Sequence, residues 1–105
     1  MSRTIMDMAF RKPFEEVENS IWRILQTNDF FETNYRGDAV WKRYNDCLGT
    51  TAVQYLQIEY GENCIHLQAW IGDEKFSGES DLNGFAGIVP KKKLKKIIEE
   101  IQNSI

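Results

Sequence analysis

The sequence has few of the residues that build metal centres and disulfide frameworks. Its two cysteines, Cys47 and Cys64, are 17 positions apart and in no CxxC pair, and His66 is its single histidine. Three soft ligands at this spacing are too few for a structural zinc site. Nothing in the sequence argues for an oxidising compartment. We therefore expect no metal, no cofactor and no disulfide.

Long hydrophobic runs are absent as well. No stretch approaches the roughly 20 apolar residues needed to cross a bilayer, and the longest candidates, at residues 88–89 and 97–98, are interrupted by charge. The first ten residues lack the apolar core of a secretory signal. The sequence therefore predicts a cytoplasmic protein that makes no contact with a membrane.

A net positive charge is lacking everywhere except in the C-terminal segment. Counted by segment, residues 1–50 carry a net charge of −1, residues 51–89 of −5 and residues 90–105 of +3, which sum to −3. General nucleic-acid binders usually have strongly basic domains. The charge therefore argues against nucleic acid as a partner, apart from a local basic contact in the C-terminal segment.

The 105 residues have the length of one domain, and their apolar pattern predicts two helices and a sheet. Apolar residues recur at helical spacing over residues 13–27, and again after Pro90. Between the helices the period is two, and turn residues divide this part into four strands at about 30–36, 39–44, 51–60 and 64–71. Residues 72–89 are expected to form a loop with a short edge strand near 75–77, and residues 1–12 fit neither period.

The expected fold is α+β, with an N-terminal helix, an antiparallel meander of four to five strands and a C-terminal helix. Both helices have one apolar stripe, so we expect both on one sheet face, covering its apolar side. This order is similar to one half of a TATA-binding-protein-like fold, an analogy that carries no function.

Strand pairing places three aromatic residues in one row. A turn at Gly37-Asp38 would pair Tyr35 with Val40 and Phe31 with Tyr44. Requiring the apolar residues of neighbouring strands to share a face then brings Trp41 next to Tyr55, and the hairpin turning at residues 61–63 brings Tyr55 opposite Trp70.

This row has two interpretations. Left open on the face away from the helices, it would be a binding surface, edged by four polar side chains: Arg36, Arg43, Gln57 and Gln68. Alternatively, the 72–89 loop, the N-terminal segment or a second protomer covers the row and makes a second small core.

Two further groups of residues have chemical potential. Cys64 and His66 share one face of a strand with Glu59 opposite His66, which resembles a nucleophile, a base and an orienting group, although side chains two apart on a strand stand nearly 7 Å apart. The other interpretation is that His66 is a half-exposed polar residue. The helix after Pro90 begins with Lys91, Lys92 and Lys93, which form either an anion site with the helix N-terminus or a solvated face.

Four segments resemble a group of small uncharacterised proteins of Gram-positive bacteria, in some of which the unit accompanies a zinc ribbon: YRGDAVWK at residues 35–42, VQYLQIEYGEN at 53–63, IHLQAWI at 65–71 and GFAGIVPKKKLKK at 84–96. The resemblance covers roughly residues 30–100. It implies a free-standing bacterial domain of unknown function and no particular chemistry.

The function expected first is a non-enzymatic binding or protein-interaction module that uses the aromatic face, with a protein partner or a second copy of the chain. The alternatives are a small hydrolase or transferase with a Cys64/His66 dyad, and a weak binder of anions or single-stranded nucleic acid. For nucleic acid we expect no affinity tighter than about 10⁻⁴ M.

Overall fold

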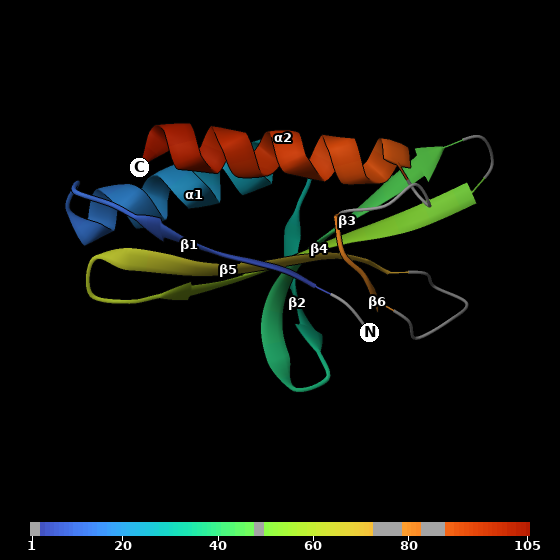
Figure 1. Ribbon diagram of the computed structural model, residues 1–105, viewed down its shortest axis with the longest axis horizontal. Coiled ribbons are helices and arrows are strands. Elements are labelled where there is room, and N and C mark those ends of the chain that lie inside the picture. The colour runs from blue at the N-terminus through green and yellow to red at the C-terminus, as the bar shows by residue number, and fades with distance from the viewer. Residues whose placement is uncertain (1–2, 48–49, 73–78, 83–87) are drawn as a thin grey trace.

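The computed structural model describes residues 3–47, 50–72, 79–82 and 88–105, and it shows two helices and an antiparallel sheet (Figure 1). In chain order the elements are β1 (Thr4–Ala9), α1 (Phe14–Thr27), β2 (Phe31–Tyr35), β3 (Asp38–Cys47), β4 (Thr50–Tyr60), β5 (Cys64–Gly72), β6 (Glu79–Ser80) and α2 (Ile88–Ser104). The α+β class, both helices and the four predicted strands are confirmed, although α2 begins at Ile88 and not at Pro90 as expected. The edge strand expected near residues 75–77 lies outside the described residues.

Residues 4–9 form a sheet strand, whereas the sequence pattern of residues 1–12 fitted neither period. The strand order is β1-β5-β4-β3-β2, and β6 pairs with the last residues of β5. Along β1 exposure alternates, with Ile5 59% exposed and Met8 only 5%. This alternation places Met8 in the core and Ile5 on the opposite face.

The main core lies between the sheet and the two helices. Figure 1 shows α1 and α2 side by side on one side of the sheet. Val17, Ile21 and Leu25 of α1 are fully buried in one cluster with residues of α2 and of the central strands. We call the sheet face toward the helices the inner face and the opposite one the outer face.

Two consecutive residues with positive φ make the turn between β2 and β3. Arg36 has φ 52° and Gly37 has φ 93°, as a two-residue turn of this twist requires. Tyr35 therefore pairs with Asp38, and the expected turn at Gly37-Asp38 is wrong. The expected pairs of Tyr35 with Val40 and of Phe31 with Tyr44 are therefore wrong by two residues. Because side chains alternate with a period of two, each side chain of β2 and β3 still shares a face with the expected neighbours.

The pairing of β3 with β4 differs from the expected one by a single residue. Trp41 pairs with Leu56, and not with Tyr55. A shift of one residue moves every side chain of a strand to the other face, so Trp41 and Arg43 belong to the inner face. Trp41 is 9% exposed and packs edge-on against Trp22 of α1, with ring centroids 5.0 Å apart. The proposed place of Trp41 in the outer row is therefore wrong.

The hairpin of β4 and β5 has the predicted register. Tyr60 pairs with Ile65, Leu56 with Ala69 and Tyr55 with Trp70. Strong alternation in both strands specifies this register, because a slip would expose an entire apolar set.

Candidate functional sites

The outer face carries an aromatic cluster made of Tyr35, Tyr55 and Trp70. Tyr55 and Trp70 are stacked, with centroids 5.2 Å apart and ring planes 13° from parallel. Tyr35 takes the third place, 4.8 Å from the Tyr55 ring and 5.2 Å from that of Trp70. Trp70 is completely buried, and the exposed fractions of Val40 and Val53 are no more than 2%. The cluster is thus a second small core, and Trp70 offers no open surface.

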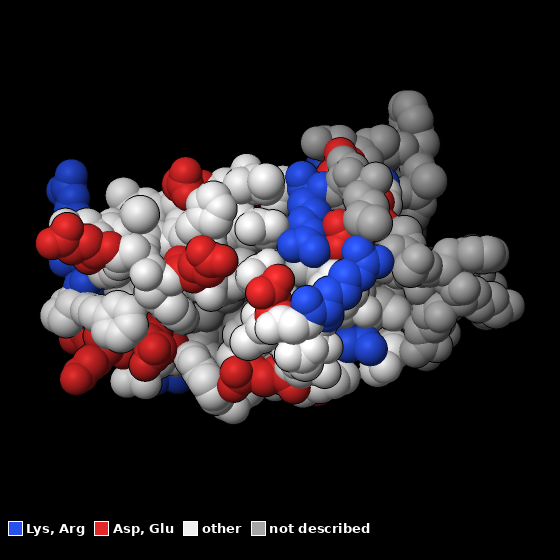
Figure 2. Space-filling view, turned by 90° about the horizontal axis from the view of Figure 1, so that it is seen from below, with Lys and Arg blue, Asp and Glu red and all other residues white. Residues whose placement is uncertain are grey.

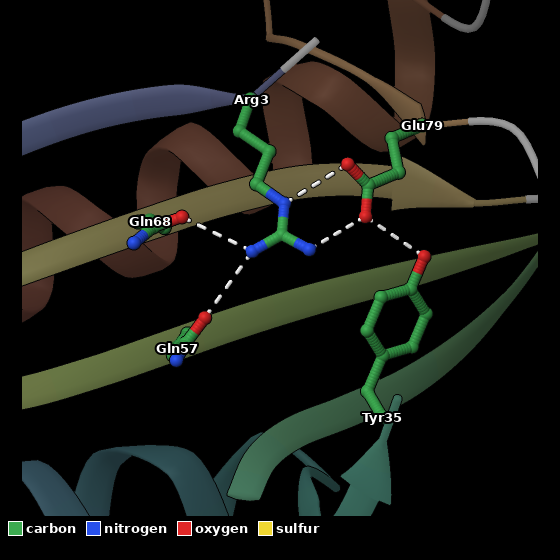
Figure 3. Close-up of polar contacts among 5 residues, drawn as sticks. All are labelled: Arg3, Tyr35, Gln57, Gln68 and Glu79. Atoms are coloured by element: carbon green, nitrogen blue, oxygen red, sulfur yellow. Dashed lines mark hydrogen bonds and ion pairs between the residues drawn. The ribbon is translucent and has the colours of Figure 1, made fainter. Parts of the chain in front are cut away.

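Arg3, next to β1, lies over the Trp70 ring of this cluster. Figure 3 shows the polar contacts that hold Arg3 in this position. Its guanidinium carbon lies 3.8 Å from the centroid of the Trp70 ring. Nε and Nη2 donate to the two carboxylate oxygens of Glu79 at 2.9 and 2.7 Å. Nη1 donates to Gln57 Oε1 at 3.2 Å and to Gln68 Oε1 at 3.1 Å. Gln57 and Gln68, expected at the border of a binding surface, are acceptors for Arg3.

Glu79, from the short strand β6, completes the closure. Its side chain is 4% exposed, and its carboxylate also accepts a hydrogen bond from the Tyr35 hydroxyl at 2.8 Å. The hydrogen bonds from Arg3 lower the pKa of Glu79 despite its burial. Burial, followed by the hydrogen bond to Glu79, raises the pKa of Tyr35. Arg3 of the N-terminal segment and Glu79 of the 72–89 region together cover the row, which is the second of the two interpretations drawn from the sequence.

Cations also lie against some of the outer aromatic rings. Figure 2, seen from the side away from the helices, shows Lys and Arg side chains crossing this face. Arg36 lies 5.2 Å from the centroid of the Tyr35 ring, and Lys42 Nζ lies 4.7 Å from that of Tyr44. Such pairs are favourable by roughly 0.5–1 kcal/mol at exposed sites. Arg36 is thus at the hairpin tip and covers Tyr35 of the cluster.

The structure gives His66 a partner that the sequence did not suggest. Glu59 is opposite His66, as predicted. The imidazole Nδ1, however, is 2.5 Å from Oδ1 of Asp7 on β1. Cys64 is exposed and forms no disulfide. The hydrogen bond of the imidazole is thus directed toward β1, and the pairing of β1 with β5, which brings Asp7 opposite His66, was not predicted.

A large cavity lies on the other side of the molecule, between α2, β3 and the turn after α1. It is an open groove of about 700 Å³. Its lining is rich in charged and amide side chains: Asn28, Asp29, Arg43, Tyr44, Asn45, Lys93, Lys96, Ile97, Glu99, Glu100 and Asn103. We call this cavity the α2 groove.

Arg43 enters the α2 groove because the β3 register turns it to the inner face. Its Nε donates to Gln54 Oε1 at 2.6 Å and its Nη1 to the carbonyl oxygen of Asn28 at 3.1 Å. Burial lowers the pKa of Arg43, and the nearby Asp29 carboxylate partly offsets this. Within the described part of the chain, no carboxylate is close enough to Arg43 for an ion pair.

Asn45, two residues further along β3, is the least satisfied polar group of the groove. It is 8% exposed, and its Oδ1 accepts from Lys93 Nζ at 3.2 Å. Its Nδ2 is buried and has no hydrogen-bond partner. Buried donors nearly always have partners. A polar residue in a strand gives no warning of this in the sequence, so Asn45 was not predicted.

The three lysines proposed for an anion site take different positions. Lys91 is 4% exposed, Lys92 is exposed, and neither lines the groove. Lys93 lines it together with Lys96, one turn further along α2. The structure thus brings together Lys93 and Arg43, which the sequence placed in two separate groups.

No family model, curated protein or solved structure matches this chain. The resemblance to uncharacterised Gram-positive proteins therefore stays a prediction. Among the described residues there is no cluster of His, Cys, Asp and Glu arranged to hold a metal ion. The same part of the chain contains no helix long and apolar enough to span a membrane.

Proposed function

We propose that the protein is a binding module whose site is the α2 groove and whose ligand is a small molecule with one anionic group. The observation that carries this proposal is the buried Nδ2 donor of Asn45, which has no acceptor and lines the same groove as Arg43.

Hydrogen-bond donors collect at one end of the groove. An unsatisfied buried donor costs about 1–3 kcal/mol, and a carboxylate or phosphate oxygen placed there would satisfy Asn45. The Arg43 guanidinium, whose hydrogen-bond partners are neutral, would gain a directly bonded counter-charge. Hydrogen bonds to an ionised group are roughly twice as strong as neutral ones. An anion therefore fits this end better than a neutral ligand.

The other charges of the groove restrict the class of anion. Asp29, Glu99 and Glu100 line it as well, so a ligand with several negative charges meets repulsion. The volume of about 700 Å³ is within the usual range for small-molecule sites. Both features favour a monoanion or a zwitterion and oppose nucleic acid.

Titrations followed by ¹H–¹⁵N NMR test this proposal, with sodium acetate, inorganic phosphate and glycine as probes. We expect saturable shifts of the Arg43 Nε–H and the Asn45 side-chain amide. Lys93→Gln and Lys96→Gln should each weaken binding roughly two- to fivefold, as expected for a partly exposed charge. Lys95→Gln, on the same helix but outside the groove, is the matched control. Shifts confined to exposed lysines, or equal effects of all three variants, would contradict the proposal.

Self-association is a second candidate, supported by the edge of the sheet. β2 is an edge strand, and Phe31 and the neighbouring Tyr44 are 45% and 46% exposed with centroids 6.2 Å apart. An exposed aromatic on an edge strand, in contact with another on the next strand, favours pairing of this edge with a second copy. Sedimentation velocity over a range of concentrations tests it. A dimer that Phe31→Ser dissociates would support this function, and a monomer at every concentration would exclude it.

A further inference from the structure

A second cavity, unrelated to the α2 groove, opens between α1 and the hairpin of β2 and β3. It measures about 220 Å³. Its aromatic walls are Trp22 of α1, Trp41 of β3 and Tyr60 of β4. The two indole rings meet at 89° with centroids 5.0 Å apart, so they form a corner. We call this cavity the indole pocket.

Two carboxylates stand beside the aromatic walls, and the fold explains both positions. Glu18 precedes Trp22 by four residues on α1, which places the two side chains on one helix face. Glu32 is directly opposite Trp41 in the pairing of β2 with β3. Both line the pocket, and within the described residues neither has an ion pair.

The negative charge of these carboxylates acts on Tyr60, which lines the pocket. Burial, with the added effect of Glu18 and then Glu32, raises the pKa of Tyr60 to about 12. No lysine or arginine is among the lining residues, which besides the aromatics and carboxylates are Ala39, Val40 and Ile58. The pocket thus combines apolar walls with a net negative charge.

We propose that the indole pocket binds the ammonium group of an organic cation, alkylated or methylated at nitrogen. The faces of tryptophan and tyrosine attract cations, and aromatic walls of this kind suit quaternary ammonium groups. The carboxylates of Glu18 and Glu32 supply charge complementarity, while Ile58 contacts the alkyl part. A strongly hydrated inorganic cation would find only the two carboxylates as charged oxygen ligands, fewer than the roughly six or more oxygens that such ions usually take.

The size of the cavity limits what enters it. At about 220 Å³ it is smaller than the sites that enclose a whole drug-sized ligand. One ammonium head fits, and the remainder of the ligand stays outside. Such a head occurs on free quaternary amines and on modified lysine side chains. The pocket and the α2 groove share no lining residue, so failure of one proposal leaves the other standing.

A comparison of charged and neutral isosteres tests the proposal. We would titrate the ¹⁵N-labelled protein with choline, tetramethylammonium and 3,3-dimethylbutan-1-ol, a neutral molecule with the shape of choline. The indole N–H signals of Trp22 and Trp41 should shift saturably with both cations and little with the alcohol, while Trp70 stays unchanged. Equal shifts with the alcohol, or no saturable shift with either cation, would overturn the proposal.

Variants separate the contributions of the walls and the charges. Trp22→Leu keeps an apolar side chain at a position that is 39% exposed, and should weaken choline binding about two- to fivefold. Glu18→Gln and Glu32→Gln should have effects of similar size. Glu15→Gln, also on α1 but outside the pocket, is the matched control and should leave affinity unchanged. If Glu15→Gln weakens binding as much as Glu18→Gln, the charges act only at long range and the site is wrong.

A last arm distinguishes the source of the ammonium group. Free trimethyl-lysine is compared with a short peptide that contains it. Tighter binding of the peptide identifies a protein ligand, and equal affinity identifies a free amine. In both cases the same peptide with alanine in place of trimethyl-lysine should not bind. Binding of that peptide would contradict recognition of the ammonium group.

Discussion

The guanidinium of Arg3 lies over the indole of Trp70, with its central carbon 3.8 Å from the ring centroid, although the two residues are 67 positions apart in the chain. This contact closes the outer face of the sheet. Arg3 is fixed there by Glu79, Gln57 and Gln68, so its charge is fully partnered. An aromatic row that would otherwise be a binding surface becomes a small core.

Removing the charge of Glu79 should weaken the hold of Arg3 over the outer aromatic cluster. Glu79→Gln leaves Arg3 without its ion pair above Trp70, and we expect a loss of about 1–3 kcal/mol in the free energy of unfolding. Urea denaturation followed by circular dichroism measures it. Glu62→Gln, at an exposed position of the β4–β5 turn, is the control and should change stability little. Equal stability of both variants would show that the ion pair does not hold the outer core.

The same carboxylate should make stability depend on pH. Hydrogen bonds from Arg3 lower the pKa of Glu79 in the folded protein, so between the folded and unfolded pKa values the unfolded state binds more protons. The stabilisation is complete above the ordinary glutamate pKa of about 4.3 and is lost as the pH falls through the lower folded value. The stability difference between wild type and Glu79→Gln should therefore shrink on acidification below about pH 4. A difference that stays constant down to the acid transition would contradict this.

Gly72, at the end of β5, is required by the Tyr55 ring. A Cβ atom at this position would lie 2.7 Å from Tyr55 Cε2. Because Tyr55 is stacked on Trp70, its ring cannot swing away without breaking the outer core. Gly72→Ala should lower the free energy of unfolding by about 1–3 kcal/mol, as overpacking usually does. Thermal denaturation measures it. A second variant, Gly72→Ala with Tyr55→Leu, should cost less than the sum of the two single changes.

The fold could be predicted from the sequence where one register satisfies the alternation of both strands. The hairpin of β4 and β5 meets this condition, since six apolar or aromatic residues must share a face. β3 does not, because its two faces are both partly apolar: Val40 is buried in the outer core and Trp41 in the inner one. The assumption that Val40 faces the helices therefore gave the wrong parity.

The sites were predictable only in part, because long-range contacts create them. Arg43 and Lys93 are 50 positions apart and meet only through the packing of α2 against β3. The cover over Trp70 depends on Arg3, whose segment had no clear period. The prediction of Tyr55 opposite Trp70 was correct because it rests on a local hairpin alone.

Trp41 provides a direct check on the corrected register. Because Trp41 is buried against Trp22 and Leu56, the change Trp41→Ala should lower the free energy of unfolding by about 3–5 kcal/mol. On an open outer face the same change would cost far less. Urea denaturation of Trp41→Ala, compared with Tyr44→Ala at a half-exposed outer position, distinguishes the two. Similar small losses in both variants would mean that the outer placement is correct after all.

The α2 groove is tested most directly by the position of a bound anion in crystals. Crystals of the protein grown or soaked in sodium bromide allow the anion to be located by its anomalous scattering. The account predicts a bromide ion within hydrogen-bond distance of the Arg43 guanidinium and of Asn45 Nδ2. Bromide found only at exposed lysines, with Asn45 Nδ2 bonded to an acceptor of its own chain, would contradict it.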